Sequence, residues 1–398
     1  MWPFKSEQRE TKMSRANSVV ALGQLGKPQW SPRNYNALAG KGYAQNPVVY
    51  RCVRMISEAA ASVPLYVFES GGGMGEHPLL QLLRNPNPRQ AGASFFEAVI
   101  GHLLIGGDAY VEAVTVDDTV AELYALRPDR MRVVPGPEGW PQAYDYVVGN
   151  STIRFRQDND FVPPILQLSL FHPLNDHYGL APLEAAATAL DILNAASAWH
   201  KALLDNSARP SGALVYAPAS GATLSREQFE RLKEELEQSF SGAANAGRPL
   251  LLEGGLDWRA MSLTPKDMDF IETRNAAARD VALAFGVPPM LLGIPGDATY
   301  SNYQEANRAF WRQCVLPLLS RLTQSLAHWL KPAFGDADLR FDTDAIPALD
   351  ADREALWARV NGVSFLTDDE KREAVGYGAH GGAQGLKFDL EPAARAGG

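Results

Sequence analysis

The chain has 398 residues, of which 46% are hydrophobic and 21% charged, enough to bury a sizeable core or to form two or three modest domains. Its 37 basic and 46 acidic residues leave a formal charge of −9, which argues against a protein that grips nucleic acid by neutralising phosphates. Two cysteines exclude a disulfide framework, and the absence of a signal peptide or an apolar run of about 18 residues predicts a soluble cytoplasmic protein without a membrane span.

The first part of the chain predicts an arm, a helix and a strand. Residues 1–45 are polar with little periodicity, so we expect an arm that a partner orders. Asn46 to Val63 is predicted as a helix, because its first residue can be the N-cap and Pro47 suits the first turn. Leu65 to Glu69 alternates like a strand, and Gly71 to Gly73 is expected to be a turn.

A helix and a set of short strands follow. Ala93 to Leu104 has helical periodicity and ends before two glycines. Alternating apolar and polar residues, broken by Gly, Pro and Asp, predict a small mixed sheet. Its strands are expected at Ala109–Val116, Glu122–Arg127, Arg130–Val134, Tyr144–Val148, Thr152–Phe155 and Ile165–Leu170.

From Pro182 onward the apolar residues recur at helical spacing, and a short insertion interrupts this pattern. Pro182 to Ser207 is predicted as one long, alanine-rich helix. A short α/β insertion follows, with a strand from Val215, a helix opened by the capping box of Ser225 and Gln228, and a strand at Pro249 to Leu252. Its helix is rich in charged residues, which indicates a solvated face or an interface.

Two more long helices are separated by a loop. Thr264 is the expected N-cap of the first and Gly286 its end. The loop GVPPMLLGIPGDATYSN cannot be helical throughout. Ser301 is expected to open the last long helix, which runs to about Leu330 with a kink at Pro317.

The C-terminal part predicts two short helices, the second opened by a capping box of Thr367 and Glu370, and a disordered tail after Gly376. The preceding acidic run lacks the glycine and terminal glutamate of a calcium loop. His172 and His177 are too few for a metal site. No GxSxG, HExxH or GxxxxGK[ST] motif occurs, so we expect no catalytic residue, cofactor or metal.

Two long helices that flank a small insertion would leave alanine-rich faces in water in a lone monomer. Burial against copies of the same helices favours a ring or bundle of subunits. Among the alternatives are a cytoplasmic α/β enzyme, which would need a complete catalytic set, and another ring-forming head–tail adaptor, a class that is usually much shorter.

The order of several segments resembles the portal (connector) family of long-tailed double-stranded DNA phages, in its compact form. They are PVVYRCVRMISEAAASVPLYVF, HPLLQLLRNPNP with ASFFEAVIGHLLIGGDAYVE, YGLAPLEAA, FIETRNAAARDVALAFGVPPMLLG with TYSNYQEANRAFW, and GVSFLTDDEKR. The likeness spans about Gln45 to Gly376. In GGDAY, Asp108 replaces the more usual Asn, and Ala181 stands where Ser is common.

The resemblance implies an α+β portal fold with an α/β wing, a two-helix stem, a small α/β clip, a long kinked helix and a helical crown. The implied parts are an arm (1–45), wing (46–181), stem helix 1 (182–208), clip (209–258), stem helix 2 (259–285), tunnel loop (286–302), long wing helix (303–338), crown (339–376) and tail (377–398).

The resemblance also implies function and partners. The chain would form a ring of 12 subunits at a capsid vertex and conduct double-stranded DNA during packaging and ejection. Its partners would be the major capsid protein, the large terminase subunit and a head–tail adaptor. The particle would be assembled in the bacterial cytoplasm, and a prophage or a gene transfer agent suits the alanine- and glycine-rich composition.

Two sets of site residues follow. The tunnel loop carries Pro288, Pro289, Gly293, Pro295, Gly296, Asp297, Thr299, Tyr300 and Asn302, and contains no lysine or arginine, which suits a flexible constriction that touches DNA without holding it. The clip helix carries the candidate interface residues Glu227, Glu230, Arg231, Glu234, Glu235 and Glu237. A plain connection between helices and a merely solvated helix face are the alternative interpretations.

Overall fold

The computed structural model describes residues 32–68, 77–158, 161–205, 212–216, 225–228, 230–231, 234, 256–260, 270–296 and 299–375. The chain divides into two compact units. The main unit comprises residues 30–195 and 271–398, and the insertion unit comprises residues 1–29 and 196–270. The two units are described separately.

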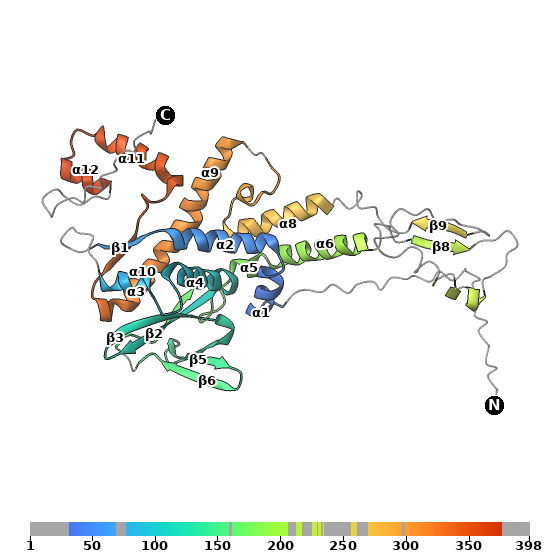
Figure 1. Ribbon diagram of the computed structural model, residues 1–398, viewed down its shortest axis with the longest axis horizontal. Coiled ribbons are helices and arrows are strands. Elements are labelled where there is room, and N and C mark those ends of the chain that lie inside the picture. The colour runs from blue at the N-terminus through green and yellow to red at the C-terminus, as the bar shows by residue number, and fades with distance from the viewer. Residues whose placement is uncertain are drawn as a thin grey trace, which may run out of the picture. The chain divides into compact units, whose positions relative to one another are not determined.

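The main unit is built on two packed helices, α2 (Pro47–Ser62) and α4 (Gly92–Gly106), with the short α3 (Pro78–Arg84) beside them. The Asn46 side chain accepts hydrogen bonds from the amides of Val48 and Val49, which confirms the predicted N-cap. Figure 1 shows α4 between α2 and the strands, so apolar side chains of both helices form the centre of the core.

Every strand pairing that the structure describes is antiparallel, so the prediction of one mixed sheet is wrong. Short connections explain the pairings of strands that follow one another in the chain. The two residues Asp117 and Asp118, both with positive φ, join their strands by a tight hairpin turn. The three sheets of the main unit have the orders β3 (Thr119–Leu126), β2 (Asp108–Val116), β7 (Ile165–Ser169); β4 (Met131–Pro135), β5 (Pro141–Val148), β6 (Ser151–Arg156); and β1 (Leu65–Phe68), β10 (Asp338–Phe341).

Part of the expected N-terminal arm is folded. The helix α1 (Tyr35–Ala37) continues into a π-helical segment (Leu38–Tyr43). The Tyr35 hydroxyl and His102 Nδ1 form a hydrogen bond of 2.7 Å, and Leu38 is buried in the core. The arm therefore ends about ten residues earlier than predicted, because an aromatic and a leucine anchor the chain to α4 without a clear period in the sequence. Residues 1–31 lie outside the described part.

The predicted long helix at 182–207 is interrupted. It consists of α5 (Pro182–Ala185) and α6 (Ala187–Asp205), separated at Ala186, whose ψ of 6° is not helical. The next long helix, α8, spans Phe270–Phe285, and its predicted N-cap at Thr264 lies outside the described residues.

The last long helix begins two residues earlier than predicted and changes pitch in the middle. It comprises α9 (Tyr300–Phe310), a π-helical segment (Trp311–Val315) and α10 (Leu316–Phe334). The irregularity lies directly before Pro317, whose ring cannot accommodate the carbonyl of an ordinary helical turn, and this is the physical basis of the predicted kink. Two short helices follow, α11 (Asp350–Asn361) and α12 (Asp368–Ala374), and the capping box of Thr367 and Glu370 is confirmed.

The described part of the insertion unit contains one antiparallel pair of strands, in which β8 (Gly212–Tyr216) pairs with β9 (Leu256–Ala260). The capping box is confirmed, since the amides of Ser225 and Gln228 each donate to the other side chain at 2.9 and 3.2 Å. The predicted strand at 249–252 and the turn at 71–73 lie outside the described residues. Among the helices that are described, none is long and apolar enough to cross a membrane.

Candidate functional site

The root of the loop that follows α8 is fixed by a helix-terminating motif. Gly286 has a φ of 70°, and its amide donates to Leu283 O at 3.0 Å while the amide of Val287 donates to Ala282 O at 2.9 Å. This pair of bonds is a Schellman motif, which confirms Gly286 as the end of the helix. Val287 is 2% exposed, so the first residue after the turn is already anchored in the core.

The next residues are ordered by their own turns. Pro288 precedes a 3-10 helix at Pro289–Leu292, which ends at Gly293 with a φ of 71°. The side chains of Leu291, Leu292 and Ile294 pack against the core. We call the stretch from Gly286 to Ile294 the loop root. Its turns and its contacts with the core make it a packed element, so the predicted flexibility can apply only to the residues that follow it.

The loop tip, Pro295 to Thr299, is exposed where the structure describes it. The Arg279 guanidinium on α8 donates from Nη2 to Pro295 O at 2.6 Å. Thr299, and not the predicted Ser301, is the N-cap of α9, because its Oγ1 accepts from the amide of Asn302 at 3.2 Å. Asp297 lies outside the described residues.

Two further candidates belong to the first turn of α9 and not to the loop. Tyr300 is 79% exposed, and its hydroxyl accepts from Gln304 Nε2 at 3.2 Å. Asn302 is also exposed in that turn. The helix begins earlier than expected because the hydroxyl of Thr299 caps it as that of Ser301 was expected to do. The structure thus describes eight of the nine predicted tunnel residues, all but Asp297, and places them in the loop root, the loop tip and the first turn of α9.

Cys314 contacts the end of α8, which no pattern in the sequence indicated. The π-helical segment places its thiol so that it donates to Phe285 O at 3.2 Å, at the last turn of α8. Burial raises the pKa of this thiol to about 11, so it packs as a neutral, unreactive group. A cysteine in an apolar stretch indicates burial, but not which carbonyl it contacts.

The candidate residues of the clip helix lie in the insertion unit. Glu227, Glu230, Arg231 and Glu234 are exposed, while Glu235 and Glu237 lie outside the described residues. Exposure fits both a solvated helix face and a docking surface, so these residues remain candidates.

A buried polar cluster lies where β2 meets the segment before α5, and the sequence did not predict it. Asp108 is 4% exposed; its Oδ1 accepts from Ser169 Oγ at 2.5 Å and from Gln167 Nε2 at 3.0 Å, and its Oδ2 from the amide of Gly179 at 2.9 Å. Burial raises the pKa of Asp108, against the opposing effect of these hydrogen bonds. The two resembling motifs GGDAY and YGLAP therefore meet in space.

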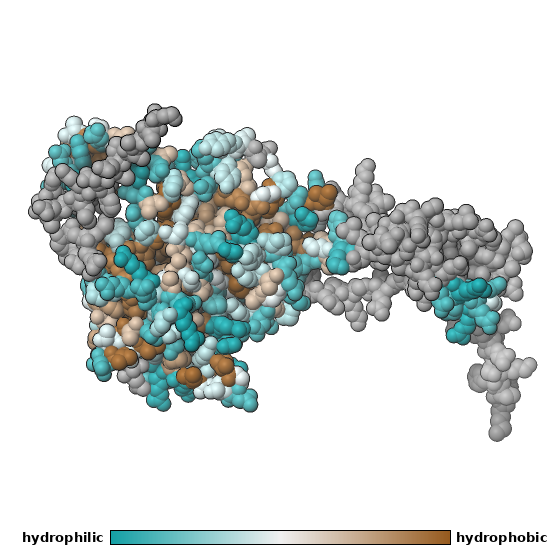
Figure 2. Space-filling view, in the orientation of Figure 1, coloured by the Kyte–Doolittle hydropathy of each residue, from teal (hydrophilic) through white to brown (hydrophobic). Residues whose placement is uncertain are grey.

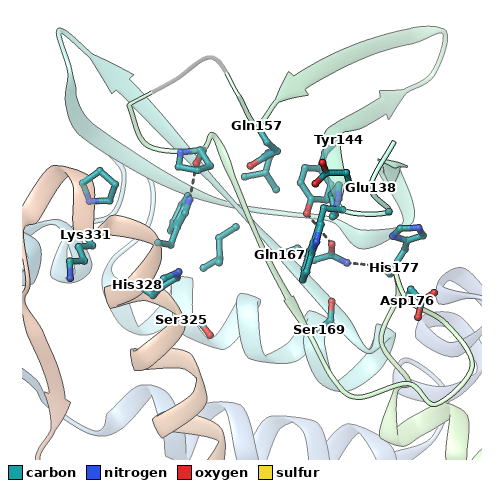
Figure 3. A pocket seen from close by; sticks show the side chains of 18 residues that line it. Glu138, Tyr144, Gln157, Gln167, Ser169, Asp176, His177, Ser325, His328 and Lys331 are labelled. Carbon is teal, nitrogen blue, oxygen red and sulfur yellow. Dashed lines mark hydrogen bonds between the residues drawn. The ribbon is translucent and has the colours of Figure 1, made fainter. Parts of the chain in front are cut away.

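A groove of about 1370 Å³ opens beside this cluster, between β5, β7, the loop before α5, and α10. Figure 3 shows Gln167 beside His177, whose carbonyl accepts from the Gln167 amide at 2.8 Å. Tyr144 donates to Gln167 Oε1 at 3.1 Å. These groups form hydrogen bonds that join elements of the main unit. The described residues contain no group of three or more side chains placed to hold a metal ion.

The acidic run after α10 forms ion pairs within the surface. Lys331 lies 3.0 Å from Asp336, Arg353 lies 3.1 Å from Asp350, and Asp352 approaches Arg308 at 3.6 Å. The pair of Arg308 and Asp352 joins α9 to α11, whereas the other two are local, and each is worth little in energy because it is exposed.

Comparison with known proteins decides the family. Residues 47–376 match the family described as phage portal protein. The chain belongs to the phage portal protein family. The resemblance found in the sequence, from about residue 45 to 376, is thereby confirmed. The protein is a portal protein, a structural component of a phage-like particle and not an enzyme.

Several relatives cover most of the chain. A protein of Rickettsia bellii is 45% identical over 338 residues, which are 84% of this chain and 87% of the relative. The portal protein of Enterobacteria phage HK97 is 26% identical over 371 residues, 89% of this chain and 81% of that protein.

Solved structures agree on the mixed α+β fold. A chain from the neck of a native gene transfer agent particle, computed with C12 symmetry, is 52% identical, with a TM-score of 0.68, and the match covers 89% of this chain and 96% of that one. A portal protein of the HK97 family from Corynebacterium diphtheriae, 16% identical with a TM-score of 0.55, covers 80% and 100% and supports the fold alone.

Proposed function

We propose that this portal protein assembles with copies of itself into a twelve-subunit ring at one capsid vertex, through which double-stranded DNA enters and leaves. The observation that carries the proposal is the 52% identical chain in a gene transfer agent neck computed with C12 symmetry. The same likeness favours a gene transfer agent or related phage-like particle as the source.

The exposed faces of two helices support the ring. Ile192 on α6 is 40% exposed, and Leu283 on α8 is 77% exposed. Exposed alanines lie on the same face of each helix, at Ala195 and Ala276. Small and apolar side chains allow helices to approach closely, so a neighbouring copy would bury these faces. Figure 2 shows apolar residues at the surface where α8 begins, and there Ile271 is 72% exposed.

We assign the parts of the ring from the likeness to the portal family. Residues 46–181 would form the wing, with 303–338 as its long helix and 339–376 as the crown. Residues 182–208 and 259–285 would form the stem, 209–258 the clip, and 286–302 the loop at the narrowest part of the channel. The pairing of β10 with β1 ties the start of the proposed crown to the wing.

The charge of the chain suits passage of DNA. Twelve copies at −9 carry about −100 charges, which repels the duplex from the wall. The clip would dock the large terminase subunit and the head–tail adaptor, and the wing would contact the major capsid protein.

The test is direct. Native mass spectrometry and negative-stain images should show a closed ring with a central hole, and a stable monomer at every salt concentration would contradict the proposal.

Deleting residues 294–299 should spare the ring yet reduce packaging or retention of DNA. Reversing the charges of Glu234 and Glu235 should weaken docking of the motor or adaptor, and unchanged docking would leave that helix a solvated face.

A further inference from the structure

The loop between β7 and α5 holds two large apolar side chains at the surface. Phe171 is 79% exposed and Leu174 is 90% exposed. They lie three positions apart in a stretch, residues 171–179, in which Asp176 is the only Asp, Glu, Lys or Arg residue. Single exposed apolar residues are ordinary, whereas two of them close together on an almost uncharged loop indicate a surface for a partner.

The loop is fixed by hydrogen bonds between its own residues. His172 Nδ1 accepts from the amide of Leu174 at 3.0 Å. Asn175 Oδ1 accepts from the amides of His177 and Tyr178 at 2.9 and 3.1 Å. Two side chains thus satisfy three backbone donors of the loop, which holds the backbone around Leu174 in one conformation.

The far end of the loop is tied to the body of the main unit. The hydroxyl of Tyr178 accepts from the amide of Val133 on β4 at 3.1 Å. The amide of Gly179 donates to Oδ2 of the buried Asp108 on β2 at 2.9 Å. Because these bonds fix the loop before any partner arrives, little conformational entropy of its backbone would be lost on contact.

We propose that Phe171 and Leu174 anchor the contact between neighbouring copies of the chain in the ring. The inference rests on the proposed function, because it needs the ring to exist. In a closed ring of more than two subunits, each contact joins two different faces of the subunit. The loop belongs to one of these faces, and its two apolar side chains are buried by the other face of the next copy.

Chemistry and position favour a second copy as the partner. Interfaces between identical subunits are more apolar than those between proteins that associate transiently, and this loop is apolar and almost uncharged. It also leads directly into α5 and α6, where the partly exposed Ile192 lies on the face proposed to meet a neighbour. A rigid anchor suits a partner that meets every subunit in the same pose, as the next copy in a cyclic ring does.

A dilution series of the full-length protein, followed by native mass spectrometry, tests the anchor. Leu174→Asp should raise the concentration at which half of the subunits are in rings at least about tenfold, because every contact loses an anchor. Trp140→Asp is the matched control and should leave this concentration unchanged. Trp140 is 78% exposed, like Phe171, but lies in the connection between β4 and β5.

Asn175→Ala tests the rigidity of the loop separately. It keeps both apolar side chains but removes the acceptor of two hydrogen bonds, so the half-assembly concentration should rise about fivefold, the effect of about one hydrogen bond. Thermal unfolding of the diluted monomers should be the same for Leu174→Asp and the wild type, because an exposed side chain contributes little to the fold.

Thiol labelling of Leu174→Cys reads burial by the neighbour directly. Burial raises the pKa of Cys52 to about 12 and that of Cys314 to about 11, so both native thiols react slowly with a maleimide. The introduced thiol should react at least about tenfold more slowly in rings than in diluted monomers, because a packed interface excludes the reagent.

The outcomes separate this inference from the proposed function. Wild-type rings with unchanged assembly of Leu174→Asp, or with equal labelling in rings and monomers, would overturn the anchor alone. An equal loss of rings in Trp140→Asp would overturn its assignment to this loop. Normal rings of Leu174→Asp that bind the head–tail adaptor or capsid protein poorly would give the loop a different partner. A wild type that forms no ring would overturn both proposals.

Discussion

Replacement of Gly179 by alanine should strongly destabilise the main unit. A Cβ at this position would lie 2.1 Å from Gly107 O, 2.7 Å from Leu170 N and 2.8 Å from Leu170 O. All three are backbone atoms of neighbouring segments and cannot turn aside as a flexible side chain can. The methyl group must push apart β2, β7 and the segment that leads into α5.

The cost can be built from the contacts. Overpacking of this kind costs about 1–3 kcal/mol. The displacement also strains two hydrogen bonds, from Leu170 N to Gly107 O at 2.8 Å and from Gly179 N to Asp108 Oδ2 at 2.9 Å, each worth about 1 kcal/mol. Alanine lowers the conformational entropy of the unfolded chain, which offsets up to about 1 kcal/mol of this loss of stability. The net loss should be about 3 kcal/mol.

Guanidinium unfolding followed by tryptophan fluorescence measures this loss, because Trp329 is buried in the main unit and its indole donates to Pro163 O at 2.7 Å. Gly101→Ala is the control with the opposite sign. Its Cβ would meet nothing within 4 Å in the middle of α4, so it should stabilise by about 0.5–1 kcal/mol. A Gly179→Ala midpoint equal to that of the wild type would refute the argument.

Three other changes have defined outcomes. Burial lowers the pKa of His102 to about 4 from 6.5, so stability should fall by about 3 kcal/mol as pH drops through that window, and His102→Gln should flatten the dependence in denaturant titrations. Because the pKa of Asp108 is raised, the contribution of this carboxyl to stability declines as pH rises above 3.8. Asp108→Asn should therefore gain stability relative to the wild type as pH rises from there; a constant difference would contradict this. Leu283→Glu should change monomer stability by less than about 0.5 kcal/mol yet abolish rings in native mass spectrometry, and intact rings would remove α8 from the interface.

Local signals in the sequence determined several parts of this protein correctly. The Asn46 cap, the Gly286 stop and the capping box of Thr367 depend on residues within a few positions of one another, so the sequence alone specifies them. The order of segments along the chain was also sufficient to indicate the portal family, because that order survives where single residues change.

Tertiary contacts decided what local signals could not. The pairing of Asp338–Phe341 with Leu65–Phe68 joins segments some 270 residues apart, and a four-residue strand among acidic residues has no pattern of its own. The loop after α8 is the clearest case. Its composition indicated flexibility and no cation, but apolar side chains pack its root against the core, and Arg279 of α8 donates a hydrogen bond to the carbonyl of Pro295. Proline and glycine fix which backbone angles the loop can adopt, whereas its anchors come from residues that only the fold brings within reach.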